Sequence, residues 1–335
     1  GMVAPALIYL LIAPSGAPSR GWGIPMATDI AFVAGFLSLL GPRVPFSLKI
    51  LLLTLAIVDD IGAILVIAVA YTAHTSIAFL VIGAIGFAIV YLVRWIGVRP
   101  VPVYIILGAA VWFAFLKSGV HPTVAGVVLG LLTPSGAWFI DRSLAKVAAG
   151  VAERFHNNAT PDEEQRDKEE REAAELLART AKESISPLDR LESALHPWVA
   201  FLIMPLFALA NAGVKIELSA VANPVALAVA AGLAFGKPIG ILAFSWVAIR
   251  LGLARLPSGV NWRALFGASC LAGIGFTMSL FIAGLALEGE LLASGKLGTL
   301  LGSAFSAIVG LASLYFFLRP ARAVSDAAPE PSAAN

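Results

Sequence analysis

Three carboxylates and one amine lie inside long apolar stretches of this chain. Asp59 and Asp60 are adjacent in LLLTLAIVDDIGAILVIAVAY. Asp29 lies in GWGIPMATDIAFVAGFLSLL, and Lys237 lies in ALAVAAGLAFGKPIGILAFSWVAI. Ionisable groups at membrane depth are costly and rare, and they usually belong to an ion or proton pathway. Because carboxylate oxygens suit hard cations and can also hold a proton, these residues predict cation and proton binding.

The two adjacent aspartates are expected to have different surroundings. Neighbouring residues on a helix point about 100° apart, so one of Asp59 and Asp60 can face a cation pathway while the other faces a neighbouring helix. Burial and the like charge next door favour a proton on one of them near neutral pH. A buried pair with a purely structural role is the alternative.

Lys237 lies too deep in its apolar run to reach a membrane surface easily. A lone buried lysine either loses its proton or pairs with a carboxylate. The candidate partners are Asp59, Asp60 and Asp29. The pair could be a structural salt bridge, or Lys237 could take part directly in charge movement.

Two of the apolar stretches contain residues that weaken a helix. In GWGIPMATD, two glycines and a proline precede Thr28 and Asp29, and in LAGIGFTMSLF, Gly273 and Gly275 precede a second polar position. Two interrupted helices in separate halves of a chain indicate an inverted-repeat transporter with its site at the breaks. The alternatives are a proline-kinked helix that Asp29 caps, and glycines that serve helix packing.

Three further residues could sense pH. His196 and Glu192 are close together in LESALHPW, and His121 opens HPTVAGVVLGLL. A histidine at a membrane boundary could titrate near neutral pH and act as a switch. Each could instead be an interfacial anchor.

Composition assigns the chain to the polytopic membrane proteins. Hydrophobic residues make up 59% of its 335 residues, charged residues 13%, and the mean hydropathy is +0.88. A typical soluble domain has about 25% charged residues, so a soluble globular enzyme, a disordered chain and a fibrous repeat are excluded. The net charge of +2 offers nucleic acid no basic field, and the single cysteine, Cys270, excludes an intramolecular disulfide or a Cys-rich metal site.

An all-α polytopic membrane protein is therefore predicted, since a crossing helix needs about 20 mostly apolar residues. The candidate spans are 21–40, 47–71, 77–96, 103–116, 121–133, 197–213, 223–249, 264–287 and 296–318. The opening run 1–13 is too short to cross and lacks the basic start of a signal peptide. We expect it to be the second half of a helix in an N-terminally truncated chain.

The spans and charges predict four regions. Residues 1–136 form the N-terminal part of a membrane domain, a partial helix plus five spans, and residues 197–320 form its C-terminal part with four spans. Between them lies a hydrophilic insert, 137–196, with 13 acids and 9 bases, and the tail 321–335 is expected to be disordered. Alternating the loops puts 18 Lys and Arg on one side and 4 on the other. The positive-inside rule then places the insert and the C-terminus in the cytoplasm.

Six of these motifs together resemble the NhaA-type Na+/H+ antiporter family. They are GWGIPMATDIAF, LKILLLTLAIVDDIGAILVIAVAYT, SGVHPTVAGVVLG, LHPWVAFLIMPLFALANAGV, FGKPIGI and AGIGFTMSLFI, in the family's order from about residue 2 to 320. The resemblance implies the twelve-helix inverted-repeat fold for which this family is an established example, with two discontinuous helices crossing at mid-membrane. By this resemblance we expect the chain to match the family from within the third helix onward, without the first two helices and the start of the third, and with an insert longer than the family's compact loop.

The resemblance also implies roles for the buried polar residues. Asp59 and Asp60 match the cation- and proton-binding pair and would hold Na+, with Asp60 as the main ligand and Asp59 as a proton carrier alternating with Lys237. Thr28 and Asp29 match the interrupted-helix residues that face the site. Lys237 matches the lysine that pairs with an aspartate and offsets the half-helix ends.

The implied function is electrogenic, pH-regulated exchange of Na+ or Li+ for H+ across the bacterial inner membrane. The protein would not be an enzyme, would use no cofactor besides the transported ions, and could form a homodimer in the lipid bilayer. A sodium-coupled symporter of an organic anion could share this architecture, and a passive channel is a further alternative. An intramembrane aspartyl protease is disfavoured, because adjacent aspartates diverge on a helix and no GxGD motif occurs.

Overall fold

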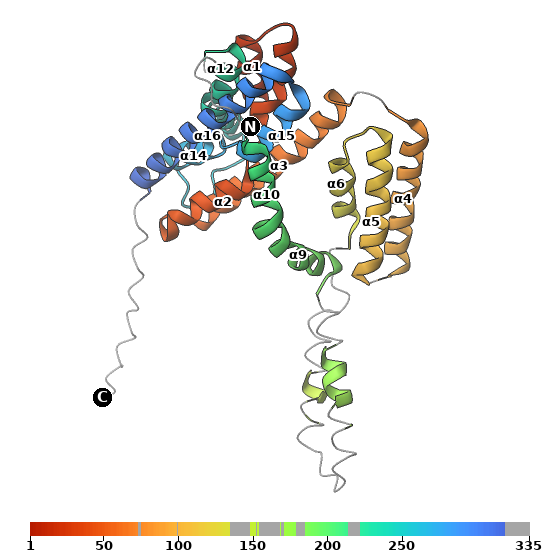
Figure 1. Ribbon diagram of the computed structural model, residues 1–335. Coiled ribbons are helices and arrows are strands. Elements are labelled where there is room, and N and C mark those ends of the chain that lie inside the picture. The colour runs from red at the N-terminus through yellow and green to blue at the C-terminus, as the bar shows by residue number, and fades with distance from the viewer. Residues whose placement is uncertain are drawn as a thin grey trace, which may run out of the picture. The chain divides into compact units, whose positions relative to one another are not determined.

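In the computed structural model all regular secondary structure within the described ranges is helical, and no strand occurs in them (Figure 1). These ranges are residues 1–72, 75–98, 100–134, 148–151, 153, 168, 171–178, 185–213 and 222–318. Most of the predicted insert at 137–196 and the whole predicted tail at 321–335 lie outside the described residues.

The helical elements follow the predicted spans closely. They are α1 (Val3–Ile12), the 3-10 segment η1 (Ala17–Met26), α2 (Ile30–Leu39), the 3-10 turn η2 (Gly41–Arg43), α3 (Phe46–Ala70), α4 (Ile77–Ile96), α5 (Val101–Ser118), α6 (Thr123–Leu132), α9 (Pro187–Trp198), the π segment η3 (Val199–Ile203), α10 (Met204–Ala212), α12 (Pro224–Ala231), the π segment η4 (Gly232–Gly236), α13 (Lys237–Arg250), α14 (Trp262–Leu271), α15 (Phe276–Ala286) and α16 (Gly289–Phe317).

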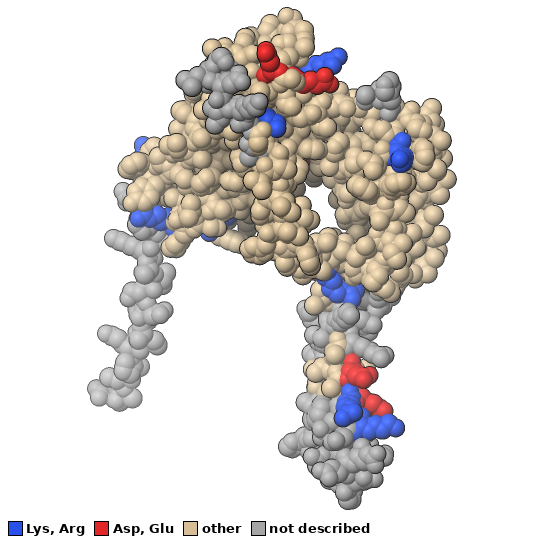
Figure 2. Space-filling view, in the orientation of Figure 1, with Lys and Arg blue, Asp and Glu red and all other residues tan. Residues whose placement is uncertain are grey.

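The helices are long and apolar enough for a multi-pass membrane protein. Among the described residues, six helical stretches could cross a membrane, and up to eight could if each of two bent pairs counts as one span. The remaining predicted span, 121–133, forms the ten-residue helix α6. Figure 2 shows a face of the molecule on which Lys, Arg, Asp and Glu are sparse and uncharged residues cover most of the helices.

Two helices begin well before their predicted spans, and one of them is α16, which begins at Gly289 and not at residue 296. The span expected at 197–213 belongs to a helical stretch that starts at Pro187 and continues through η3 into α10, so the expected end of the insert at 196 falls inside a helix. Ser186 starts this helix, because its hydroxyl accepts the amide of Asp189 at 3.0 Å and Pro187 occupies the first helical position. The polar residues of the first turns lower the local hydropathy, so a search for apolar runs does not detect this first part of the helix.

The prediction of two interrupted helices is confirmed. η1 and α2 are bent by 43° across the extended residues before Ile30, and α14 and α15 are bent by 49° across the residues before Phe276. Pro25 and the glycines before it give the first half a 3-10 rather than an α-helical course.

The chain divides into two units, each described by itself. Unit 1 is Gly1–Tyr71 with Ala208–Asn335, and unit 2 is Thr72–Phe207. In unit 2, α4 and α5 pack along each other through Gly83 and Gly86, whose missing side chains make room for Phe115 and Val111.

Unit 1 has two apolar clusters with α3 common to both. Leu48 and Leu52 of α3 belong to a cluster with α2, α14 and the end of α16. Ala63 and Ile67 of α3 belong to a cluster with α1, η1, α12 and α15. Asp59 lies on the same buried stripe of α3 between these two sets. The packing of α3 on both sides therefore fixes the depth and direction of the Asp59 carboxylate.

Glycines at every fourth position bring α1 against the helix that carries Lys237. An ideal Cβ on Gly232 or Gly236 would lie within 3.2 Å of Pro5 backbone atoms, and one on Gly240 would lie 2.8 Å from Cβ of Ala4. Small residues at this spacing allow two membrane helices to approach closely.

Gly236→Ala is expected to destabilise unit 1. A Cβ at this position would lie 2.6 Å from Cα of Pro5, so the backbone of α1 would have to move. We expect a loss of about 1–3 kcal/mol in the free energy of unfolding, measured by thermal unfolding in detergent. The matched control is Gly284→Ala on α15, where a Cβ meets no described atom within 4 Å. Equal melting temperatures for the two variants would contradict this account.

Candidate ion-binding site at the two broken helices

One carboxylate caps both of the half-helices that begin at the breaks. Oδ1 of Asp29 accepts the amide of Phe32 at 3.2 Å and so caps α2. Oδ2 of Asp29 accepts the amide of Thr277 at 3.0 Å and also the hydroxyl of Thr277, and so caps α15. The amide of Asp29 donates to the carbonyl of Ile274 at 2.6 Å, which ties the two breaks together. Half-helix N-termini carry partial positive charge, and the carboxylate is suitably placed to offset it.

The carbonyl ends of the other two half-helices meet hydrogen-bond donors. Nζ of Lys237 donates to the carbonyl of Met26 at the end of η1, at 2.5 Å. The hydroxyl of Thr28 donates to the carbonyl of Ala272, just after α14, at 2.8 Å. Helix C-termini carry partial negative charge, so the lysine offsets it at this end of the crossing.

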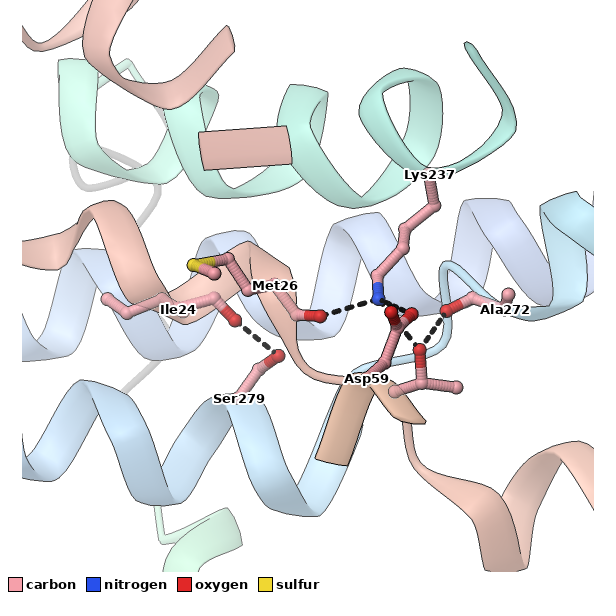
Figure 3. Close-up of polar contacts among 7 residues, drawn as sticks. Ile24, Met26, Asp59, Lys237, Ala272 and Ser279 are labelled. Carbon is pink, nitrogen blue, oxygen red and sulfur yellow. Dashed lines mark hydrogen bonds and ion pairs between the residues drawn. The ribbon is translucent and has the colours of Figure 1, made fainter. Parts of the chain in front are cut away.

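Lys237 pairs with Asp59, one of the three carboxylates that the sequence left as candidates. Its Nζ lies 2.6 Å from Oδ2 of Asp59 and also donates to the hydroxyl of Thr28 at 2.9 Å. The lysine is 0% exposed and Asp59 is 3% exposed. Figure 3 shows the Lys237 side chain pointing from its helix toward the Met26 carbonyl and the Asp59 carboxylate. The π segment η4 ends directly before Lys237, and such segments often occur where a helix positions a functional residue.

Asp60 has different surroundings from its neighbour. It is partly buried, and its Oδ1 is buried without a hydrogen-bond partner among the residues that the structure describes. The charges of Lys237, Asp29 and Asp59 all act on this carboxylate. A buried acceptor without a donor is costly, so Asp60 offers a ready oxygen ligand for a cation or a position for a proton.

The chemistry of this site is that of hard oxygen donors. No group of three or more His, Cys, Asp or Glu that could hold a metal ion occurs among the described residues. The candidate ligands are the carboxylates of the adjacent residues Asp59 and Asp60 and the hydroxyl of Thr28. Lys237 donates to both Thr28 and Asp59. Oxygen donors of this kind could hold a hard cation.

The three candidate pH sensors belong to unit 2. Glu192 and His196 are exposed on α9. His121 lies between α5 and α6, where its Nδ1 is 2.7 Å from the Thr123 hydroxyl. Burial lowers the pKa of His121, which favours the neutral ring at pH 7.

The structure adds two serines that the sequence reasoning missed. Ser303 on α16 accepts the amides of Gly275 and Phe276, at 3.2 and 3.1 Å. Ser279 on α15 donates to the carbonyl of Ile24 in η1 at 2.7 Å (Figure 3). For Ser279 the sequence signal was a hydroxyl residue shortly after a break, where freed backbone groups need partners, whereas for Ser303 it was only a hydroxyl residue within an apolar run.

These features define a class of membrane protein. Two bent helices meet at a buried carboxylate, and a buried lysine–aspartate pair adjoins a carboxylate oxygen that meets no hydrogen-bond donor in the described part of the chain. This is the architecture of a secondary transporter with discontinuous helices. The family profile described as Na+/H+ antiporter 1 matches residues 1–314, and the chain belongs to this family.

Relatives from several bacteria support this membership. The Na+/H+ antiporter NhaA of Rhodopirellula baltica is 49% identical over 96% of this chain and 72% of the relative. The Na+/H+ antiporter NhaA 2 of Sorangium cellulosum is 48% identical over 96% of this chain and 70% of the relative. The corresponding values for the Na+/H+ antiporter NhaA of Rhizobium meliloti are 46%, 96% and 73%. The resemblance inferred from the sequence motifs and the fold class expected from it are thus confirmed.

Proposed function

We infer that this chain is a secondary active transporter that exchanges Na+ for H+, and that it is not an enzyme. The observation that carries this inference is a carboxylate oxygen of Asp60 that has no hydrogen-bond partner among the described residues, next to the buried Lys237–Asp59 pair at the two broken helices. Membership in a family whose relatives are named as Na+/H+ antiporters supports the same function. The alternative of a sodium-coupled symporter finds no support in these comparisons.

The proposed mechanism is competition between a cation and protons for one set of carboxylates. Asp60 is the main Na+ ligand and must be deprotonated to bind it. Asp59 helps to hold the ion, and it can do so only when it releases Lys237. A lysine without its counter-ion in a dry interior favours loss of its proton. Na+ binding on one side of the membrane thus releases protons to that side, and the reverse occurs on the other side.

The fixed charges at the half-helix ends make such a cycle feasible. Asp29 and Lys237 offset the helix ends within the crossing, so the site remains balanced when a cation or proton leaves. Because Asp60 and the Asp59–Lys237 pair each contribute a proton per Na+ ion, we propose that more protons than sodium ions move and that exchange is electrogenic.

Several further properties belong to the same proposal. Li+ has the same charge and preference for oxygen, so it is expected to replace Na+. We also propose that the protein lies in the bacterial inner membrane with the insert 137–196 and the C-terminus in the cytoplasm, and the excess of bases on one set of loops supports this orientation. We further propose that no cofactor is needed, that the protein can form a homodimer, and that Glu192, His196 and His121 contribute to pH regulation.

Proteoliposomes that contain a pH-sensitive dye test this function directly. With an acidic interior and no other substrate, added Na+ or Li+ should collapse the pH gradient, whereas K+ or choline should not. A membrane potential set with K+ and valinomycin should change the rate if exchange is electrogenic. A requirement for an organic anion would favour the symporter, and Na+ flux without proton flux would favour a channel.

A further inference from the structure

The cap of half-helix α15 comes from two different helices. At the start of an α-helix the first amides lack an intrahelical acceptor. In α15 these are the amides of Gly275, Phe276 and Thr277. Ser303 Oγ accepts the first two, at 3.2 and 3.1 Å, while Asp29 accepts the third, at 3.0 Å. Gly275 occupies the N-cap position and has no side chain with which to cap the helix itself.

The two broken helices differ in which residues accept the first amides of their second halves, α2 and α15. α2 has a carboxylate, Asp29, at its own N-cap, whereas α15 has Gly275 there. The long helix after the first break, α3, carries Asp59 and Asp60, and the long helix after the second break, α16, carries Ser303 at the crossing. A hydroxyl therefore supplies the missing cap in the second half, and it adds no charge to the site.

The surroundings of Ser303 give this cap consequences for Asp29. Ser303 is 5% exposed and Thr277 is 1% exposed, so water offers little replacement for a lost acceptor. Asp29 is the carboxylate already bonded to the adjacent amide, and its other oxygen is committed to Phe32 of α2. Without the serine hydroxyl, the freed amides would draw Asp29 toward α15 and away from α2.

We propose that Ser303 is a positioning residue of the ion site, which acts by leaving Asp29 free to bridge the two half-helices. This inference rests on the proposed exchange of Na+ for H+ at Asp60. Asp29 directly follows Thr28, whose hydroxyl accepts a hydrogen bond from Nζ of Lys237 at 2.9 Å. The same Nζ lies 2.6 Å from Asp59, the neighbour of Asp60. If the Asp29 carboxylate accepts more amides of α15, its negative charge is more fully offset and attracts a cation at Asp60 less strongly. The cation should then bind less tightly, while the steps that set the maximal rate change little.

Initial rates of Na+-driven proton flux in proteoliposomes test this role with the full chain. Ser303→Ala should raise the KM for Na+ about tenfold and leave the maximal rate within about twofold. The matched control is Ser269→Ala, since Ser269 is also buried and, in the described part of the chain, its hydroxyl donates to the carbonyl of Phe266 in its own helix and not to another helix. It should leave both constants within about twofold of the unsubstituted protein. A lower maximal rate with an unchanged KM in Ser303→Ala would mean a merely structural serine and would overturn the proposal.

A second measurement tests the role of Ser303 without a transport assay. If the unsubstituted protein exchanges no Na+, the proposed function is wrong, but this measurement still decides whether Ser303 positions Asp29. Melting temperatures in detergent are compared for Ser303→Ala, Asp29→Asn and the double variant. If Asp29 moves to cover the amides that Ser303 leaves, that compensation is weakened in Asp29→Asn. The double variant should then lose more than the sum of the two single losses. Additive losses would show that the residues act independently and would overturn the proposal.

Discussion

Asp60→Asn is expected to reduce Na+-driven proton flux by about 100-fold or more while the protein remains folded. The amide keeps the size of the side chain but removes the negative charge that binds Na+ and the group that exchanges a proton. Asp60 Oδ1 has no hydrogen-bond partner among the described residues, so the substitution breaks no bond of that oxygen. Proton flux in proteoliposomes, at saturating Na+ and with equal amounts of reconstituted protein, measures the effect.

Stability separates this loss from misfolding. Removing an unpaired, partly buried charge should leave the melting temperature in detergent unchanged or raise it. Glu288→Gln is the matched control, because this exposed carboxylate precedes α16 and makes no cap bond with its side chain. It should transport at the rate of the unsubstituted protein. Flux within a few-fold of normal in Asp60→Asn would remove Asp60 from the ion pathway.

Much of the fold could be predicted from the sequence because its strongest signals are local. Apolar runs of about 20 residues locate membrane helices with little dependence on the rest of the chain. The glycines and Pro25 before Thr28 weaken a helix wherever they occur, and so do Gly273 and Gly275 in the second half. The helix that starts at Pro187 was the largest exception, because its first turns are too polar for an apolar run and its start depends on the Ser186 cap.

The site was less predictable because its bonds join distant parts of the chain. Burial alone indicated that Lys237 needs a carboxylate, but only the packing of α3 decides that Asp59 and not Asp60 meets it. Nothing local shows that Asp29 caps α15 as well as α2. Ser303 was missed for a related reason. A serine in an apolar helix more often allows close helix packing than accepts the free amides at a break in another helix.

Lys237→Met is expected to lower the free energy of unfolding by about 3–5 kcal/mol. The substitution removes the bonds to Met26, Thr28 and Asp59 and leaves the Asp59 carboxylate buried without its counter-ion. The side chain is 0% exposed, so solvent cannot compensate. Asp59→Asn should be destabilising in the same way, because it leaves the lysine charge unpaired. Thermal unfolding in detergent, or chemical denaturation where it is reversible, measures both losses.

The double variant Asp59→Asn with Lys237→Met decides whether the pair is structural or moves charge. Because neither charge is then left unpaired, most of the stability lost in each single variant should return. If Lys237 only holds the fold together, transport should return with the stability and keep its response to a valinomycin-set membrane potential. We expect instead that the stable double variant loses that response, since one proton per cycle no longer moves. A double variant that is stable and still electrogenic would contradict the role of Lys237 in charge movement, and one as unstable as the single variants would contradict the pairing itself.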